Sequence, residues 1–426
     1  MADESPARIT RVKLKNYKSI VSCDVELRPL TILVGPNGSG KSNFVDALRF
    51  VSEALTVGLE QAIRNRGNIF QILAEASWPG TATFSVELDF KLASGVSGQY
   101  SLTIGALSED GDFTVQGEGL ILDDGVRPVG ARLFSVEEDG LTSVWRASRG
   151  GDSVSSVRGR ASDVEERWSP QTLFLVTYAG HSAARPVFDL LTSMAFYNPT
   201  PLTMRIPRER EPGVRLSPDG ENVASVLRRI EATKPETFWR ITQYLSRVLP
   251  GLETVSGRDL GGYDSIEFRQ RLAGRDVPCT FAPRQMSDGT LRALGILVAL
   301  FQGRMGGKSA VSLIGIEEPE AGLHPAVGGA MLNALIDASE STQLLVTTHS
   351  ADLLDNDDVD VESLLAVVAE DGVTQIGPVD EVGRSLLRDR LYTAGELLHF
   401  DQLRPAVDGS ESSTEPEVGH PSPVSR

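Results

Sequence analysis

Three short, nearly continuous apolar runs stand out along the chain. They are "LTILV" at 30–34, "SLIGI" at 312–316 and "QLLVTT" at 343–348. Strands that are buried on both faces of a parallel sheet have this pattern, and each run ends abruptly in polar residues. Because ligands bind beyond the carboxyl ends of the strands in open α/β sheets, we expect the polar residues that follow these runs to meet at one edge of one sheet.

Other parts of the chain show different hydrophobic periods. Alternation over 8–29 predicts strands that lead into "LTILV", and period two over 83–146 predicts strands and hairpins. Apolar residues at helical spacing predict a helix over 43–57. Two more helices are predicted at "GENVASVLRRIEA" and "PETFWRITQYLSRVL", the second with Pro235 at its start. The Gly/Ser-rich stretch at 148–163 predicts a mobile connector.

The composition predicts a soluble globular protein in the cytoplasm. Apolar residues make up 40% of the chain, yet no apolar run approaches the roughly 18 residues that span a bilayer. The first residues lack the layout of a signal peptide. Two cysteines, Cys23 and Cys279, give no disulfide framework and are predicted to be reduced thiols. We therefore expect no membrane partner.

The formal net charge of -17 argues against a surface that coats DNA over its whole extent. Basic residues nevertheless concentrate in "RITRVKLKNYK" and "MRIPRERE". A local basic groove for DNA therefore stays open, beside the simpler reading of two solvated charged faces.

"GPNGSGKS" at 35–42 has the spacing of a phosphate-binding loop between a strand and a helix. Glycines let backbone N–H groups surround phosphates, and the helix that follows presents its positive end to them. Lys41 places a cation at the phosphate oxygens, and Ser42 offers a hydroxyl to Mg²⁺. The expected nucleotide-binding residues are Gly35, Pro36, Asn37, Gly38, Ser39, Gly40, Lys41, Ser42 and Asn43.

"IGIEEPE" places two carboxylates where the second apolar run ends. Successive side chains of a strand point in opposite directions, so Glu317 and Glu318 are expected to act differently. Glu317 would hold Mg²⁺, and Glu318 would orient and deprotonate the attacking water. Pro319 predicts an extended conformation for Glu318. His349, directly after the third run, is a candidate sensor of the γ-phosphate, so the catalytic set is Lys41, Glu318 and His349.

The order "GPNGSGKS", "RQMSDGTLRALGILVAL", "LIGIEEPEAGLHP" and "TTHS" resembles the core of ABC-type ATPases. More narrowly it resembles the RecF, OLD and structural-maintenance-of-chromosomes (SMC) branch of AAA-family ATPases, over about 8–90 and 275–400. The opening "ITRVKLKNYKSI" is similar to that branch's first strand and adenine-side segment. The resemblance implies ATP and Mg²⁺ as cofactors. It also implies an α/β P-loop fold of ABC-ATPase type, with a mainly parallel core sheet, an antiparallel β lobe and an inserted helical region.

Within this resemblance, "MSDGT" stands at the signature loop of such ATPases. Ser287, Asp288 and Gly289 would then contact ATP that is held by a second copy of the chain, which implies an ATP-dependent homodimer or higher oligomer. Asp288 departs from the glycine that is commonest at this place, which leaves the dimer geometry open. By spacing alone, "MSDGTLR" also fits an ordinary helix start with Ser287 or Asp288 as its N-cap.

The resemblance assigns further residues. Gln71 in "NIFQIL" is the candidate for the glutamine that contacts metal and water, with Gln61 as its competitor. Tyr17 and Lys18 are placed near the adenine. His324 stands where transporters usually have aspartate.

The expected organisation has four parts. Residues 1–150 would form the N-terminal part of the ATPase core with the phosphate loop and the β lobe, and 151–270 an inserted, largely helical region. Residues 271–403 would complete the core, and 404–426 would be a disordered tail rich in Pro, Ser and Glu.

The leading functional hypothesis is an ATP-gated dimeric switch in DNA repair or anti-phage defence. About 75 residues follow "TTHS" and they lack the Toprim nuclease pattern, so we expect a separate nuclease subunit as partner. Two alternatives stay open: the nucleotide-binding subunit of an ABC transporter, and an ATP-binding scaffold with negligible turnover.

Overall fold

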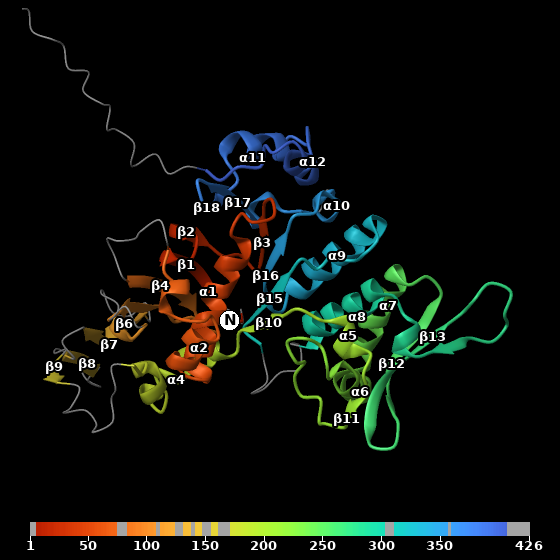
Figure 1. Cartoon of the computed structure of the whole chain (residues 1–426), viewed down its shortest axis with the longest axis horizontal. Helices are drawn as coiled ribbons and strands as arrows, with labels where there is room; N and C mark the ends of the chain where they lie inside the picture. Colours follow the sequence, from red (N-terminus) through yellow and green to blue (C-terminus); the bar gives the residue numbers. More distant parts are fainter. Residues whose placement is uncertain are drawn as a thin grey trace, which may run out of the picture.

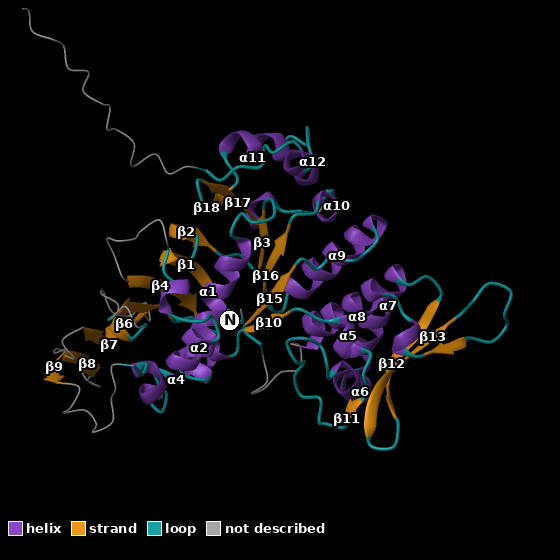
Figure 2. Ribbon diagram, in the orientation of Figure 1, coloured by secondary structure: helices purple, strands orange, loops and turns teal. Residues whose placement is uncertain are grey.

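The computed structural model describes residues 6–74, 83–107, 111–123, 131–137, 141–146, 155–160, 171–302, 311–356 and 359–406. Over 131–160 the description covers backbone strands only. Two large sheets with helices between and around them make up this part of the chain (Figures 1 and 2). The predicted disordered tail lies outside the described residues from 407 onward.

The central sheet contains the three apolar runs. Among the described residues it has six strands, in the order β10–β15–β16–β3–β17–β18. These strands are β3 (Leu30–Val34), β10 (Ala195–Tyr197), β15 (Leu313–Glu317), β16 (Gln343–Thr348), β17 (Leu364–Glu370) and β18 (Val373–Pro378). All pair in parallel except β18, which is antiparallel to β17. The predicted parallel sheet is confirmed, and every residue of β16 is buried, as expected for its central place.

The second sheet is the predicted antiparallel β lobe. Within the described ranges its order is β2–β1–β4–β5–β6–β7–β8–β9. The strands are β1 (Arg8–Tyr17), β2 (Ile20–Glu26), β4 (Thr83–Lys91), β5 (Ser97–Ala106), β6 (Phe113–Asp123), β7 (Ala131–Glu137), β8 (Leu141–Arg146) and β9 (Ser155–Arg160). β9 corrects the prediction of a mobile connector at 155–160, because its backbone pairs with β8 despite the Gly- and Ser-rich sequence. The rest of the predicted connector, 148–154 and 161–163, lies outside the described residues.

Helix α1 (Lys41–Thr56) packs between the two sheets. One apolar cluster joins its Phe44 and Leu48 to residues of the β lobe and to Leu33 and Leu345 of the central sheet. Helices α2 (Leu59–Arg64), α3 (Phe174–Tyr178) and α4 (Arg185–Thr192) contribute to the same cluster. The helix that follows the phosphate loop is therefore fixed on both sides.

The other face of the central sheet is covered by a second helical layer around α8 (Asp288–Gln302), which is buried along almost its whole length. The layer also contains α5 (Pro201–Met204), α6 (Val223–Thr233), α7 (Pro235–Val248), α9 (Gly328–Ser339), α10 (Ala351–Leu354), α11 (Glu381–Arg388) and α12 (Ala394–His399). The predicted helices at 220–232 and 235–249 correspond to α6 and α7.

The elements of residues 151–270 include more strands than the sequence predicted. β10 belongs to the central sheet, and β11 (Arg208–Glu209), β12 (Leu252–Asp259) and β13 (Tyr263–Gln270) form a third, antiparallel sheet with β14 (Cys279–Phe281). Figure 1 shows the β12–β13 hairpin projecting beyond the helices. At the other end of the chain, Pro405 bridges to Val379, so the ordered part continues slightly past residue 403. The four-part division itself stays a prediction.

A buried carboxylate joins the β lobe to α3. Glu118 on β6 accepts hydrogen bonds from the backbone N–H groups of Phe174 at 2.5 Å and Leu175 at 3.0 Å, and from the Tyr100 hydroxyl at 2.9 Å. Burial raises the pKa of Glu118 to about 7, although these three donors act to lower it.

We predict that Glu118 makes the fold less stable as the pH rises from about 4.5 to about 7. Within this window the folded protein keeps a proton that the unfolded chain has lost. The stabilisation by protonated Glu118 is therefore complete below the pKa of the unfolded chain, and it is lost as the pH rises through the pKa of the folded protein. Glu118→Gln should flatten this dependence, by on the order of 3 kcal/mol across the window. Urea unfolding at several pH values measures it. Glu87→Gln on β4 is the control, and equal pH slopes in wild type and Glu118→Gln would contradict the assignment.

Candidate nucleotide site

The phosphate-binding loop lies between β3 and α1 and is packed closely from behind. Gly38 has φ 79° and Gly40 has φ 101°, a backbone region that favours glycine. A Cβ atom at Gly40 would lie 2.0 Å from Thr374 Oγ1, and one at Gly35 would lie 2.0 Å from the carbonyl oxygen of Val367. Strands β17 and β18 thus hold the loop in a shape that only glycine permits at these positions.

Lys41 lies over this loop. Its side chain is buried, and Nζ donates to the carbonyl oxygens of Gly35 and Pro36, both at 2.8 Å. Burial lowers the pKa of Lys41, while the charges of nearby carboxylates oppose that change. Ser39 Oγ is buried and makes no hydrogen bond within the described structure. The loop therefore combines a cation, a free hydroxyl and a glycine cradle, which fits a nucleotide phosphate.

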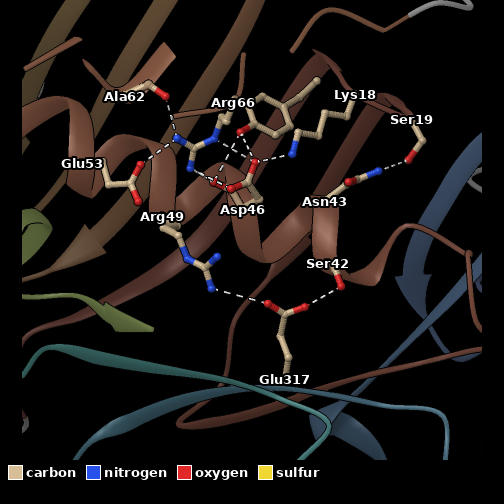
Figure 3. Close-up of polar contacts among 11 residues, drawn as sticks. Lys18, Ser19, Ser42, Asn43, Asp46, Arg49, Glu53, Ala62, Arg66 and Glu317 are labelled. Carbon is tan, nitrogen blue, oxygen red and sulfur yellow. Dashed lines mark hydrogen bonds and ion pairs between the residues drawn. The ribbon is translucent and has the colours of Figure 1, made fainter. Parts of the chain in front are cut away.

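Ser42 and Glu317 meet where the loop faces the end of β15, as Figure 3 shows. Ser42 Oγ donates to Glu317 Oε2 at 2.5 Å. Hydroxyl and carboxylate oxygens suit Mg²⁺, which is usually bound through one or two carboxylates together with substrate phosphates. The described residues contain no cluster of three or more His, Cys, Asp or Glu side chains that would hold a metal ion by themselves. The donor set therefore fits an ion that arrives with a nucleotide.

Arg49 is a neighbour of this pair that the sequence interpretation missed. Its Nη2 lies 3.4 Å from Glu317 Oε1, and its guanidinium lies 5.2 Å from the ring centroid of Phe196. Ser42 and Arg49 are seven residues apart on α1, which is close to two helical turns. That spacing was the available signal, but it does not reveal that Glu317 is the shared partner.

Glu318 points to a different partner. Its Oε1 lies 3.0 Å from His349 Nδ1, and its backbone N–H donates to Thr347 O at 2.9 Å. The predicted extended conformation is wrong, because Glu318 has φ 48°. The sharp turn after β15 separates the two carboxylates, with Glu317 toward the loop and Glu318 toward the end of β16.

Glu320 is a third carboxylate at this edge, also missed from the sequence. Thr348 Oγ1 donates to Glu320 Oε1 at 2.5 Å, and Glu320 Oε2 is buried without a hydrogen bond in the described structure. Burial raises the pKa of Glu320. Thr348 is the last residue of β16 and directly precedes His349. Its hydrogen bond to Glu320 therefore fixes the turn that carries Glu318 against the end of β16.

The signature-loop candidates lie at the start of α8. Ser287 Oγ accepts from the Thr290 N–H at 3.1 Å, which is an N-cap contact. Asp288 is 73% exposed and pairs with Arg205 at 2.5 Å. Gly289 is buried, and a Cβ atom there would lie 2.2 Å from Gly322 O. Within one chain, Ser287 therefore acts as the N-cap of α8. Its contact with a partner's ATP stays a prediction.

Four other assignments have less support from the geometry. Tyr17 is fully buried and its ring packs against Phe50 and Phe84, so the described structure exposes no part of the ring to a ligand. Gln71 and Gln61 are exposed on the segment after α1, and in the described structure neither has a hydrogen bond to Ser42 or Glu317. His324 caps a 3₁₀ turn, where its Nδ1 accepts from Ala326 N at 3.2 Å.

Comparison with known proteins places the chain in a family. The family model described as "AAA domain, putative AbiEii toxin, Type IV TA system" matches residues 30–355, from β3 through α10. The chain belongs to this AAA-domain family. The comparisons support the predicted place of the chain in the RecF/OLD/SMC-like branch of ABC/AAA ATPases.

Two curated relatives illustrate the branch. The Old nuclease of Escherichia phage P2 is 22% identical over 376 residues, which are 82% of this chain and 57% of that protein. The chromosome partition protein Smc of Methanocaldococcus jannaschii is 41% identical over 63 residues, which are 15% of this chain and 5% of that protein. The AAA-domain chain therefore spans 57% or less of the length of these relatives.

A solved structure supports the fold. A crystal structure of an Smc head bound to the C-winged helix domain of ScpA matches with a TM-score of 0.50 at 16% identity. The match covers 87% of this chain and 96% of that one. At this identity the likeness concerns the fold alone, which is the predicted P-loop ATPase architecture. Separately, no helix in the described ranges is long and apolar enough to cross a membrane.

Most basic side chains of the two basic segments of this AAA-domain protein form ion pairs. The pairs are Arg11–Asp24, Lys13–Glu87, Arg205–Asp288, Arg208–Glu221 and Arg210–Asp259. Most of these side chains are partly exposed, so each segment forms a mixed-charge surface. A basic groove for DNA has no support from these residues.

A second charge cluster fixes α1 against the β lobe (Figure 3). Asp46 accepts hydrogen bonds from Tyr17 at 2.8 Å and from Arg66 at 2.7 Å, and Lys18 Nζ lies 2.6 Å away. Burial acts to raise the pKa of Asp46, but Arg66 and Lys18 lower it below its usual value. Lys18, assigned to the adenine side from the sequence, is thus engaged with α1.

We predict that Asp46→Ala destabilises the protein by about 3 kcal/mol or more, because it leaves the buried Arg66 without its main carboxylate. Thermal or urea unfolding measures the change. Glu60→Ala is the matched control, since it breaks the exposed Arg64–Glu60 pair and should cost about 1 kcal/mol or less. Similar effects of the two variants would mean that the Asp46 cluster adds nothing to the fold.

Proposed function

We propose that this protein binds and hydrolyses ATP and acts as an ATP-gated dimeric switch. The observation that carries the proposal is the meeting of three elements at one sheet edge: the phosphate loop, the Ser42–Glu317 pair and the Glu318–His349 pair. Membership of an AAA-domain family supports ATP as the nucleotide.

Each of these side chains has a proposed task. Backbone N–H groups of 35–42 and Lys41 would bind the β- and γ-phosphates, with Lys41 exchanging its loop carbonyls for phosphate oxygens. Ser42 and Glu317 would hold Mg²⁺, which when bound neutralises charge on the phosphates. Glu318 would orient the attacking water and take its proton. His349, which contacts Glu318 at 3.0 Å, would hold that carboxylate toward the γ-phosphate.

The dimer proposal places the start of α8 against a partner's ATP. The N-terminus of this helix offers a positive dipole end and free N–H groups to a phosphate. Asp288 brings a negative charge to the same place, but Arg205 pairs with it. Ser287 and Gly289 would then approach the γ-phosphate, while the partner's loop holds the rest of the nucleotide.

The biological setting is proposed from the relatives. The name of the phage P2 Old nuclease and the match over 82% of this chain support work beside a nuclease, in DNA repair or anti-phage defence. The same match favours this setting over a transporter subunit. Co-purification of the tagged protein with a nuclease encoded beside it tests the partner, and a chain that purifies alone in the presence and absence of ATP would argue against it.

We predict that Glu318→Gln lowers ATP turnover by roughly 10²-fold or more, because the amide keeps the shape of the side chain and loses the base. ATP affinity should stay within about threefold of wild type, since the phosphate loop is unchanged. Phosphate release and calorimetric binding measure the two quantities. Glu381→Gln, at an exposed position of α11, is the control. Undiminished turnover in Glu318→Gln would remove Glu318 from the role of base.

We predict that Ser287→Asp abolishes ATP-dependent dimerisation whereas Ser287→Asn retains it. Both residues can replace serine as the N-cap of α8, so helix stability is matched. Only aspartate brings a charge that repels the partner's γ-phosphate. Both substitutions are made in a chain that also carries Glu318→Gln, so that bound ATP is not hydrolysed. Light scattering in the presence of ATP then measures dimer formation. Identical assembly of the two variants would leave "MSDGTLR" as a capped helix start.

A further inference from the structure

Arg292 connects the signature helix to the end of β15. It lies on α8, five residues after Ser287, and its Nη2 donates to the carbonyl oxygens of Glu317 at 3.0 Å and Glu318 at 3.3 Å. Its Nη1 donates to Asn198 Oδ1 at 2.8 Å and to Pro199 O at 3.3 Å. One guanidinium thus joins α8, the end of β15 and the loop after β10.

The arrangement depends on the shape of arginine. The planar guanidinium presents five donors in a fixed fork, whereas lysine presents one compact ammonium group. The side chain is half-buried, and this burial lowers the pKa of Arg292 against the effect of three nearby carboxylates. Its Nε is buried without a hydrogen bond in the described structure.

The carbonyl groups that Arg292 contacts belong to a strained turn. Glu318 has φ 48°, and a residue other than glycine keeps such a conformation only when its surroundings fix it. Its N–H donates to Thr347 O at 2.9 Å, and its carbonyl accepts from Ala321 N at 3.0 Å. Arg292 adds contacts on both sides of the strained residue. These contacts set the direction in which the Glu318 carboxylate leaves the backbone.

A second contact links the same two elements. Gly289, two residues after Ser287, approaches Gly322 so closely that a Cβ atom would lie 2.2 Å from the Gly322 carbonyl oxygen. Gly322 itself has φ 77°, so the turn is shaped to permit this approach. The start of α8 and the turn at 317–322 therefore touch at two places. A shift of the start of α8 would therefore change both contacts.

We propose that Arg292 is a positioning residue, which fixes the backbone of Glu318 and couples the signature loop to the hydrolytic carboxylate of the same chain. The inference rests on the proposed function. A partner's nucleotide that engages Ser287 and Gly289 would act on α8, and Arg292 would carry that displacement to Glu318. Each chain would then hydrolyse its own ATP only after its signature loop has engaged the other.

The test is Arg292→Lys, with Arg240→Lys as the matched control. Arg240 on α7 also packs against α8, but at the end of that helix that is distant in sequence from Ser287. Its guanidinium lies 5.9 Å from the Phe301 ring and pairs with Asp337 at 2.7 Å. Arg292→Lys should lower kcat by about 10- to 100-fold and change the KM for ATP by about threefold or less, because a misplaced base slows the reaction without removing the phosphate contacts. Arg240→Lys should leave kcat unchanged.

Two further measurements separate positioning from general destabilisation. Hydrogen exchange of the peptide that spans 313–323 should become faster in Arg292→Lys and stay unchanged in Arg240→Lys. ATP binding should persist in both. If Arg292→Lys does not fold, Asn198→Ala removes one acceptor of the guanidinium and should lower kcat by roughly 3- to 10-fold at constant KM.

Several results would overturn the inference: wild-type kcat in Arg292→Lys, an equal loss in Arg240→Lys, or a rise in KM without loss of kcat. If Arg292→Lys does not fold, a wild-type kcat in Asn198→Ala would do the same. Failure of the proposed function is recognised separately, because Glu318→Gln would then retain full turnover. If Glu318→Gln loses turnover as expected while Arg292→Lys keeps the wild-type kcat, only the proposed coupling through Arg292 is wrong.

Discussion

The register of the parallel strands determines where the candidate side chains that follow β3, β15 and β16 lie. Val34 pairs with Thr348, and Thr347 pairs with Glu317, so the three strands end within one residue of each other. The next residues are therefore Gly35, His349 and Glu318, which meet beyond the sheet. In a sheet with a side-chain period of two, a slip of one residue would turn the alternating side chains to the opposite face.

Charge balance is the second condition for this edge. Three carboxylates, Glu317, Glu318 and Glu320, lie within the field of Lys41 and Arg292, and burial lowers the pKa of both cations. Neither cation is exposed enough for water to screen it fully. Opposite charges thus stabilise one another across the turn after β15. Removing one member changes the electrostatic environment of the rest, so the effects of substitutions at these five positions are not additive.

The part of the site that follows from local sequence was predictable. Spacing located the phosphate loop, and short apolar runs located the strands whose ends meet at it, because both depend on contiguous residues. Arg49, Arg292 and Glu320 were missed since their importance lies in partners that are distant in the chain. The left-handed Glu318 was missed because Pro319 favours an extended predecessor, and tertiary contacts override that preference. The burial of Tyr17 was missed because its hydrogen bond to Asp46 has no sequence signature.

The pairing of β3 has a consequence for synthesis on the ribosome. β3 ends at Val34, and its two neighbours, β16 and β17, begin at Gln343 and Leu364. At about 5–20 residues per second, roughly 15–60 seconds pass before the first of these neighbours is made. The antiparallel β lobe, built from residues 8–160, has all its strands much earlier. The nascent chain therefore carries the apolar β3 segment without its sheet neighbours through most of its translation, and a strand without neighbours is open to pairing with a wrong partner.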